Sequence, residues 1–281
     1  MTSPTPPTAP RSPSPAIPAW AGLGWEEAVI PDSIDSLAVT AIEDYTFYRN
    51  SRLNSVTVPA SITSIGEQAC TGCSALTSIT VEAANSNYSS LVGVLFNKSR
   101  TELIQFPGGK AGAYSIPVGV ITIGDHAFES SSELTNVIIP GSVTSIGEYA
   151  FSQCTDLSSL VLPNSVNLIG QFALYFCTGL TSLTISNDID TIPFGAFYAC
   201  ERLTSLTIPA SVTKIEANAF AYCSVLTTID IPDAVTSIGE FAFSDCKSLT
   251  SVTIPTSITS IGDSAFAHCY ELIRASFLGN A

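Results

Sequence analysis

The stretch LTSVTIPTSITSIGDSAFAHCYE, residues 249–271, decides the fold because the chain repeats it. Residues 203–225 read LTSLTIPASVTKIEANAFAYCSV, and residues 134–156 read LTNVIIPGSVTSIGEYAFSQCTD. The leucines that open these units recur every 23 residues, at Leu134, Leu157, Leu180, Leu203, Leu226, Leu249 and Leu272, and Leu53 and Leu76 have the same spacing. A repeat of about 20–30 residues predicts a solenoid in which each coil stacks on its neighbours.

Each repeat holds eight apolar positions that we expect to face the interior. In residues 249–271 they are Leu249, Val252, Ile254, Ile258, Ile261, Ala265, Phe266 and Cys269. Val252 and Ile254 alternate as in a short strand, which Pro255 ends because proline has no N–H to donate. Gly262 is expected to adopt a positive φ at a tight corner. The spacing of the last three apolar positions predicts one short helical turn facing the core.

One coil is too small to fold alone. Burying eight apolar side chains contributes on the order of 10–20 kcal/mol, and ordering the 23 residues of one repeat costs a similar or larger amount. Stacking is therefore required, and side chains of like chemistry lie over one another in successive coils. Parallel strands with one helical turn per coil predict an α/β repeat solenoid.

The array is irregular in two places, in its first coil, which begins near Trp25 and is too long, and between Leu76 and Leu134. The spacing between Leu76 and Leu134 is 58 residues, where two repeats would give 46. The extra segment, near residues 85–107, contains two apolar runs at 92–96 and 103–106 with NKSR between them. Two such runs joined by a polar turn predict a β-hairpin insertion.

Charge excludes some partners. The chain has 281 residues, 24 acidic and 10 basic, and a formal net charge of -14. Nucleic acids and anionic membranes bind basic surfaces, so we expect neither as a partner. No run approaches the roughly 20 consecutive apolar residues of a spanning helix, so we expect no membrane insertion either.

The N-terminal segment has a different composition from the repeats. Residues 1–19 hold seven of the chain's 17 prolines and nothing that could form a core, so we expect a Pro-rich disordered tail before a solenoid at 20–281. The tail is either a linker or, through the PxxP spacing of Pro10 and Pro13, a ligand for a proline-recognising domain. Trp20 and Trp25 are candidates to cap the first coil. The final strand at the C-terminus has no cover, which suggests either a longer native protein or pairing at this end.

Seven of the eight cysteines occupy one slot of the repeat. They are Cys73, Cys154, Cys177, Cys200, Cys223, Cys246 and Cys269. Adjacent coils would place neighbouring members roughly 5 Å apart, which permits disulfides, but a buried ladder of reduced thiols is the preferred interpretation. Cys70 and Cys73 form a lone CxxC. Cys70 stands in the Phe slot of the repeat and Cys73 in the Cys slot, so both are expected to face the core, whereas a redox motif needs an exposed thiolate.

No catalytic or cofactor site is predicted. His126 and His268 lie in different repeats, and no nucleophile motif accompanies them. Carboxylates such as Glu148, Glu240 and Asp263 follow the corner position and are interpreted as acids at a helix start. The phosphate-binding glycine motifs and a second CxxC are absent from the sequence, so we expect no nucleotide, metal or other cofactor.

The repeat consensus, L-x-S-V-T-I-P-x-S-V-T-S-I-G-x-x-A-F-x-x-C, resembles the BspA-like branch of the leucine-rich repeat proteins. The inserted N-x-x-Y-x-S-x-x-G-V-L-F-N-K, from Asn85 to Lys98, is similar to a variant found between repeats in that family. The resemblance covers about residues 25–281. It implies a curved right-handed superhelix with short parallel strands on its concave face. It also implies surface display, adhesion or protein binding without catalysis, so the chain is not expected to be an enzyme.

The outward strand positions are the candidate contact surface for a protein or, alternatively, a glycan. They are Asn136, Ile138, Ser159, Val161, Ser182, Thr184, Ser205 and Thr207, with the least uniform patch formed by the first four. The alternative is that the hydroxyl rows only suit a strand and keep it soluble. A second function remains open, a structural spacer within a longer repeat protein. The missing secretory signal favours the cytoplasm, whereas the resemblance favours the cell surface or secretion.

Overall fold

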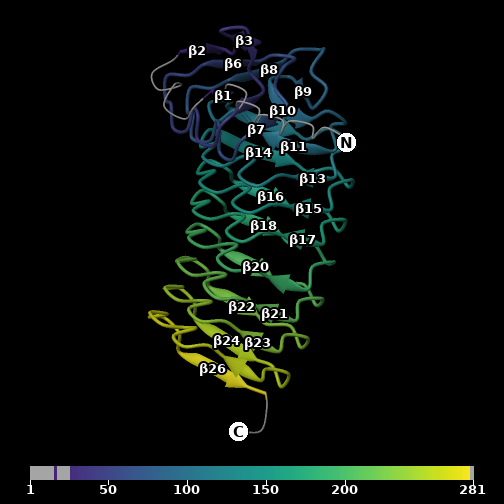
Figure 1. Ribbon diagram of the computed structural model, residues 1–281. Coiled ribbons are helices and arrows are strands. Elements are labelled where there is room, and N and C mark those ends of the chain that lie inside the picture. Colours follow the sequence, from purple (N-terminus) through teal and green to yellow (C-terminus); the bar gives the residue numbers. More distant parts are fainter. Residues whose placement is uncertain (1–15, 18–25, 279–281) are drawn as a thin grey trace, which may run out of the picture.

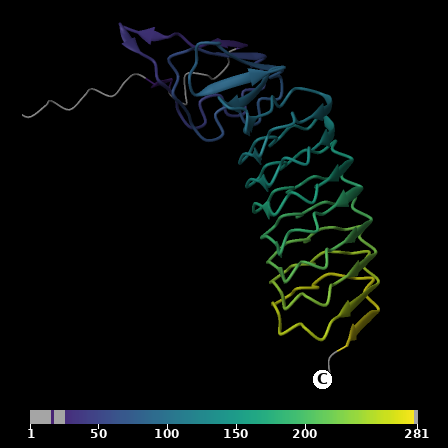
Figure 2. The ribbon, with the colours of Figure 1, turned by 90° about the vertical axis from the view of Figure 1, so that its right-hand side faces the viewer.

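The structure is a computed structural model that describes residues 16–17 and 26–278. These residues form an elongated stack of coils along one long axis (Figure 1). Seen from the side, the N-terminal coils lean away from the axis of the later ones (Figure 2). Nearly all of the predicted tail, together with Trp20 and Trp25, lies outside the described residues.

Each regular coil contributes one longer strand to one side of the stack. These strands pair in parallel into three sheets, β2-β6-β8, β12-β14-β16-β18 and β20-β22-β24-β26. Their bounds are β2 Glu27–Val29, β6 Ser55–Val58, β8 Ser78–Val81, β12 Gly112–Ser115, β14 Leu134–Ile138, β16 Ser159–Val161, β18 Ser182–Thr184, β20 Ser205–Thr207, β22 Thr228–Asp230, β24 Ser251–Ile254 and β26 Arg274–Phe277. The parallel-strand solenoid predicted by the 23-residue period is confirmed.

A second side carries mostly two-residue strands, in the sheets β1-β5-β7, β17-β15-β13-β11-β10-β9 and β19-β21-β23-β25. Their bounds are β1 Ala16–Ile17, β5 Ala41–Ile42, β7 Ser64–Ile65, β9 Tyr88–Leu91, β10 Val94–Asn97, β11 Glu102–Gln105, β13 Thr122–Ile123, β15 Ser145–Ile146, β17 Leu168–Ile169, β19 Thr191–Ile192, β21 Lys214–Ile215, β23 Ser237–Ile238 and β25 Ser260–Ile261. A small hairpin, β3 Ser33–Ile34 with β4 Leu37–Ala38, stands apart from both sides.

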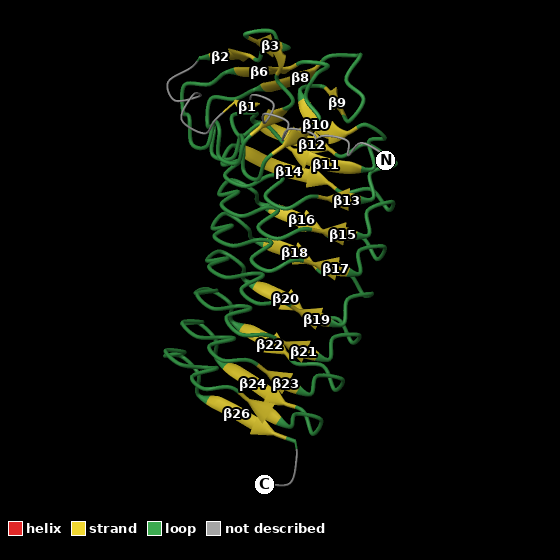
Figure 3. Cartoon of the chain, in the orientation of Figure 1, coloured by secondary structure: helices red, strands yellow, loops and turns green. Residues whose placement is uncertain are grey.

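The predicted helical turn does not exist. The described residues contain strands and turns but no helix (Figure 3). Two left-handed residues in each coil, such as Phe241 (φ 54°) and Asp245 (φ 58°), prevent a right-handed helix from continuing. Alternate N–H groups bond instead to the next coil, as Phe243 N does to Ala265 O at 2.8 Å. The apolar spacing that suggested a helix therefore belongs to a third side, whose N–H groups pair between coils.

The eight inward positions are confirmed for coils inside the stack, whereas in the last repeat, residues 249–271, Ile261 is 40% exposed and Ile258, Phe266 and Cys269 are partly buried. In residues 226–248, all eight are buried: Leu226, Ile229, Ile231, Val235, Ile238, Ala242, Phe243 and Cys246. Phenylalanine rings stack from coil to coil, with centroids 5.3 Å apart for Phe197 and Phe220 and 5.2 Å apart for Phe220 and Phe243. Like side chains therefore form ladders along the core, as the repeat predicts.

The corner glycine has a different reason from the one expected. Gly262 is not among the residues with positive φ. A Cβ there would lie 2.4 Å from Glu240 N and 2.7 Å from the carbonyl carbon of Gly239, both backbone atoms of the preceding coil. Close approach of two coils, and not a left-handed turn, is what requires glycine.

The predicted hairpin insertion is confirmed and extended. β10 pairs antiparallel with β11 and also with β9, which adds a third strand. Leu95 of β10 packs in the N-terminal hydrophobic cluster, whereas Val94 and Phe96 pack in the C-terminal one. The insertion therefore divides the core into two clusters and joins them through the two faces of one strand.

Candidate binding surfaces

The structure places the eight predicted contact residues on four successive longer strands. Asn136 pairs with Ser159, and Val161 pairs with Thr184, so β14, β16 and β18 form one outward surface. The side chains of Ile138 and Val161 are 57% and 59% exposed on it. Ser205 and Thr207 lie on β20, which begins a separate sheet. Six of the eight residues thus share a sheet, and their role as contacts stays a prediction.

The cysteine slot is a ladder of reduced thiols, as predicted. All eight cysteines are free, and all except the half-buried Cys269 are buried. Each thiol in the slot donates to a carbonyl of the preceding coil, such as Cys177 Sγ to Phe151 O at 3.1 Å. Burial raises the pKa of Cys177 to about 12, which keeps the nucleophilic thiolate scarce at neutral pH.

The CxxC pair is also part of the core. Cys70 and Cys73 are both buried, and Cys73 Sγ donates to Phe47 O at 2.9 Å. Burial raises the pKa of Cys70 well above its ordinary value, and the neighbouring Cys73 adds to the effect. These are the opposite conditions from those of a redox-active thiol.

The two histidines have separate surroundings. His126 Nδ1 lies 2.5 Å from Glu129 Oε2, and its ring stacks on Tyr149 at 5.2 Å. His268 Nδ1 lies 3.1 Å from the hydroxyl of Tyr270. Within the part of the chain that the structure describes, no three His, Cys, Asp or Glu side chains are grouped to bind a metal ion.

The interpretation of the corner acids as helix-start residues is wrong, because no helix follows them. Their carbonyl groups accept the N–H of the preceding coil. Glu148 O receives His126 N at 2.8 Å, and Glu240 O receives Asn218 N at 2.9 Å. These positions therefore contribute backbone bonds between coils.

A contiguous group of partly exposed rings on the third side, which we call the aromatic strip, is not predicted from the sequence. It comprises Tyr149, Phe172, Tyr175, Phe176, Tyr198 and Tyr222. Neighbouring centroids lie 4.6–5.4 Å apart. The signal was present, because Tyr149 and Phe172 are 23 residues apart, as are Tyr175 and Tyr198.

The aromatic strip borders an open groove, and carboxylates lie beside two of its rings. Tyr175 and Phe176 line a groove of about 720 Å³ with Arg49, Ser130 and Gln153. Burial is the main cause of the raised pKa of Tyr198, and the Asp245 carboxylate contributes. Burial likewise raises the pKa of Tyr149, with a contribution from Glu148. The rings therefore have carboxylates beside them.

The repeat architecture agrees with a known family. A model of the BspA type leucine rich repeat region matches in 6 copies, over residues 40–113, 106–226 and 213–280. The chain belongs to the BspA-type leucine-rich repeat family. A comparison of this BspA-type chain with curated proteins finds no match.

Solved structures of bacterial leucine-rich repeat proteins resemble this BspA-type solenoid. A leucine-rich repeat protein from Eubacterium ventriosum is 30% identical with a TM-score of 0.80, covering 86% of this chain and 64% of that one. A leucine rich cell surface protein from Faecalibacterium prausnitzii is 26% identical with a TM-score of 0.55, covering 90% and 60%. This chain thus spans less than two thirds of either relative.

None of the described segments of this BspA-type chain is a helix with the length and apolar character needed to cross a bilayer.

Proposed function

We propose that this chain is a non-enzymatic protein-binding module. The aromatic strip is the observation that carries the proposal. Tyrosine is enriched among the residues that dominate binding energy at protein interfaces, because it buries a large area and keeps a polar hydroxyl. Six rings in mutual contact across successive coils offer such an area, and the groove beside Tyr175 and Phe176 offers a place for a protruding side chain.

The charge beside the strip indicates the chemistry of the partner. Asp245 and Glu148 lie near the rings of Tyr198 and Tyr149, and the whole chain carries a formal charge of -14. Arginine and lysine bind both carboxylates and the faces of aromatic rings. We therefore expect a protein surface rich in arginine, whose association slows at high salt.

The predicted strand-face contacts form a second surface within the same proposal. Ile138 and Val161 supply its exposed apolar area, and the resemblance implies that these strands line a concave face of a right-handed superhelix. Contact through this surface would use the rows of Ser and Thr beside it. A protein partner is preferred over a glycan because the strip joins aromatic rings to an open groove.

A selection of peptides displayed on phage against the full chain tests the proposal. Peptides enriched in arginine should bind at least about tenfold more weakly to a Tyr198→Ser/Tyr222→Ser variant, since each ring loses its stacking and cation contacts. Tyr270→Ser is the matched control, because Tyr270 is 72% exposed and lies outside the strip.

Two other results would contradict the proposal that the aromatic strip is the contact surface. Loss of binding only in Ile138→Ser/Val161→Ser would move the contact to the strand face. Failure to select any saturable binder would favour the structural spacer. Circular dichroism of each variant confirms that it has folded before binding is compared.

A further inference from the structure

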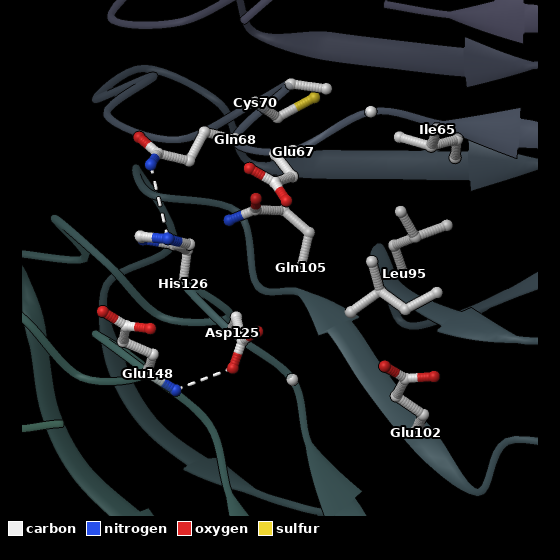
Figure 4. Close-up of a pocket in the computed structure, with 14 residues that line it drawn as sticks. Ile65, Glu67, Gln68, Cys70, Leu95, Glu102, Gln105, Asp125, His126 and Glu148 are labelled. Carbon is white, nitrogen blue, oxygen red and sulfur yellow. Dashed lines mark hydrogen bonds between the residues drawn. The ribbon is translucent and has the colours of Figure 1, made fainter. Parts of the chain in front are cut away.

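The insertion leaves a cavity where two coils fail to stack directly. β7 and β13 belong to different sheets, and a cavity of about 460 Å³ lies between the turn segments that follow them (Figure 4). Gln68 and Cys70 line it from the coil before the insertion, and Asp125 and His126 line it from the coil after. Its volume is within the range of about 300–1,000 Å³ that is typical of ligand pockets.

The first wall of this cavity has backbone donors without acceptors. In the regular coils the corresponding N–H donates to the next coil, as His126 N does to Glu148 O at 2.8 Å and Phe241 N to Asp263 O at 3.0 Å. Neither the N–H of Gln68 nor that of Cys70 finds an acceptor among residues 16–17 and 26–278. Both groups occupy the repeat positions whose N–H points along the stack, toward the cavity.

The second wall lacks a donor. The carbonyl of Glu148 receives an N–H from the preceding coil, but the equivalent carbonyl of Asp125 receives none from the described residues. Within the insertion, the N–H of Phe106 donates to the next carbonyl of this wall, Ala127 O, at 2.7 Å. The insertion therefore supplies a donor for Ala127 O, but the neighbouring backbone bond, which in a regular stack would join Gln68 N to Asp125 O, is missing. We call this missing bond the open rung.

Two side chains at the cavity also have acceptor oxygens that receive no hydrogen bond from the described residues. Asp44 and Asp125 each accept the N–H of the residue 23 positions later, at 2.8 and 2.7 Å, but no described N–H reaches the carboxylate of Glu67 at the same repeat position. Gln105 is 7% exposed and donates Nε2–H to Phe106 O. Its Oε1 accepts no hydrogen bond from the described part of the chain, and its amide points into the cavity (Figure 4).

The charge of the walls is one-sided. Four carboxylates line the cavity, from Glu67, Glu102, Asp125 and Glu148. None of its described lining residues is a lysine or an arginine. His126 is the one basic side chain at the edge, and Glu129 already occupies its Nδ1.

We propose that this cavity binds an extended peptide segment of a partner protein that bears a lysine or arginine side chain. An extended peptide presents a C=O and an N–H in alternation, as the open rung requires. Its C=O accepts from Gln68 N–H, and its N–H donates to Asp125 C=O. This is strand addition to an interrupted ladder, a recurring mode of peptide recognition. The cationic side chain meets the Glu67 and Glu102 carboxylates.

This site goes beyond the proposed function, because the strip residues changed in its test, Tyr198 and Tyr222, neither line the cavity nor stack on a residue that does; Tyr149 alone of the strip stacks on a lining residue, His126. Changing Tyr198 and Tyr222 should leave peptide binding here intact, and changing Glu67 should leave strip binding intact. The two proposals can therefore fail independently.

Amide hydrogen exchange in the free 281-residue chain tests the premise. The amides of Gln68 and Cys70 should exchange at least about tenfold faster than those of His126 and Phe128, which donate to the next coil. Equal exchange rates for these two pairs of amides would contradict the premise that the Gln68 and Cys70 N–H groups lack acceptors.

Titration with blocked tripeptides, followed by amide chemical shifts, tests the ligand. Acetyl-Gly-Arg-Gly-amide should shift the Gln68 and Cys70 amides saturably. The glutamine analogue, acetyl-Gly-Gln-Gly-amide, should bind about tenfold more weakly, and so should a peptide whose arginine N–H is methylated. Guanidinium ion alone should not reproduce these shifts. Equal binding by the methylated peptide, or equal shifts with guanidinium, would overturn the proposed backbone pairing.

A pair of matched variants places the site. Glu67→Gln should weaken the arginine peptide about tenfold, because the cation loses one carboxylate. Glu240→Gln is the control, since Glu240 occupies the same repeat position in a coil that is followed directly by another. Equal affinity of the two variants would contradict a site at Glu67.

Discussion

Replacement of Gly170 by alanine tests why the corner must be glycine. A Cβ on Gly170 would lie 2.4 Å from Glu148 N, 2.4 Å from the carbonyl carbon of Gly147 and 2.7 Å from Glu148 Cα. Comfortable contacts between such atoms are about 3.5–4.0 Å, so the two coils must separate by roughly 1 Å at this corner. No flexible side chain can absorb the overlap, because all three atoms belong to the backbone.

The cost follows from the bonds that this separation stretches. Gly170 N donates to Ile146 O at 2.8 Å, and Tyr149 N donates to Gln171 O at 3.0 Å. Lengthening each by about 1 Å takes it beyond hydrogen-bonding range and costs about 1 kcal/mol per bond. With residual overpacking of about 1 kcal/mol, we expect Gly170→Ala to lower the free energy of unfolding by about 3 kcal/mol.

Urea unfolding followed by circular dichroism measures this change as a lower midpoint at similar slope. Gly141→Ala is the control, because a Cβ at Gly141 meets nothing within 4 Å and its φ is not positive. That variant should remain within about 0.5 kcal/mol of the original protein. Equal stability of the two alanine variants would refute close approach as the reason for the corner glycine.

Three further changes probe the core and the insertion. Phe220→Ala should cost about 3–5 kcal/mol in urea unfolding, whereas Phe220→Leu should cost less than about 1.5 kcal/mol because Leu174 already fills the same slot. Asn85→Ala should cost at least about 3 kcal/mol, since buried Asn85 makes four hydrogen bonds of 2.8–2.9 Å, and exposed Asn54→Ala should be neutral. The pKa of Cys177 is raised from 9.0 to about 12, so the folded chain keeps a proton that the unfolded chain loses. Unfolding free energy should therefore fall above pH 9, by up to about 1.4 kcal/mol per pH unit per thiol, and a flat profile to pH 11 would contradict this.

The stacking order could be predicted because the repeat determines which residues are neighbours. A period of 23 places Cys154 under Cys177 and Phe220 under Phe243, whatever the detailed path of the chain between them. The same argument assigned Leu, Ile, Phe and Cys to the interior. The insertion was predicted from its apolar runs, but β9 was missed because its sequence, YSSL, is mostly polar.

The backbone conformation of the third side could not be predicted from the sequence, because the spacing of apolar residues does not indicate the sign of φ. Positions such as Phe241 and Asp245 adopt left-handed backbone although neither is glycine. Bonds to the next coil stabilise that backbone, and a pattern within one repeat contains no information about them. The cavity was equally inaccessible, since it arises where residues 58 positions apart, Gln68 and His126, face each other across the insertion.

The same dependence on neighbours weakens the third side at the boundary of the insertion. A left-handed residue other than glycine costs roughly 1–2 kcal/mol, and Gln68, with a φ of 51°, lacks the bond to the next coil that offsets this cost elsewhere. Only side chains compensate there. Gln68 Nε2 lies 3.3 Å from His126 Nε2, and β10 packs Leu95 on one core cluster and Phe96 on the other. A ligand that supplies the missing backbone bond would thus stabilise a coil that gains less from stacking than the regular coils do, which is why peptide binding and slower exchange at Gln68 should appear together.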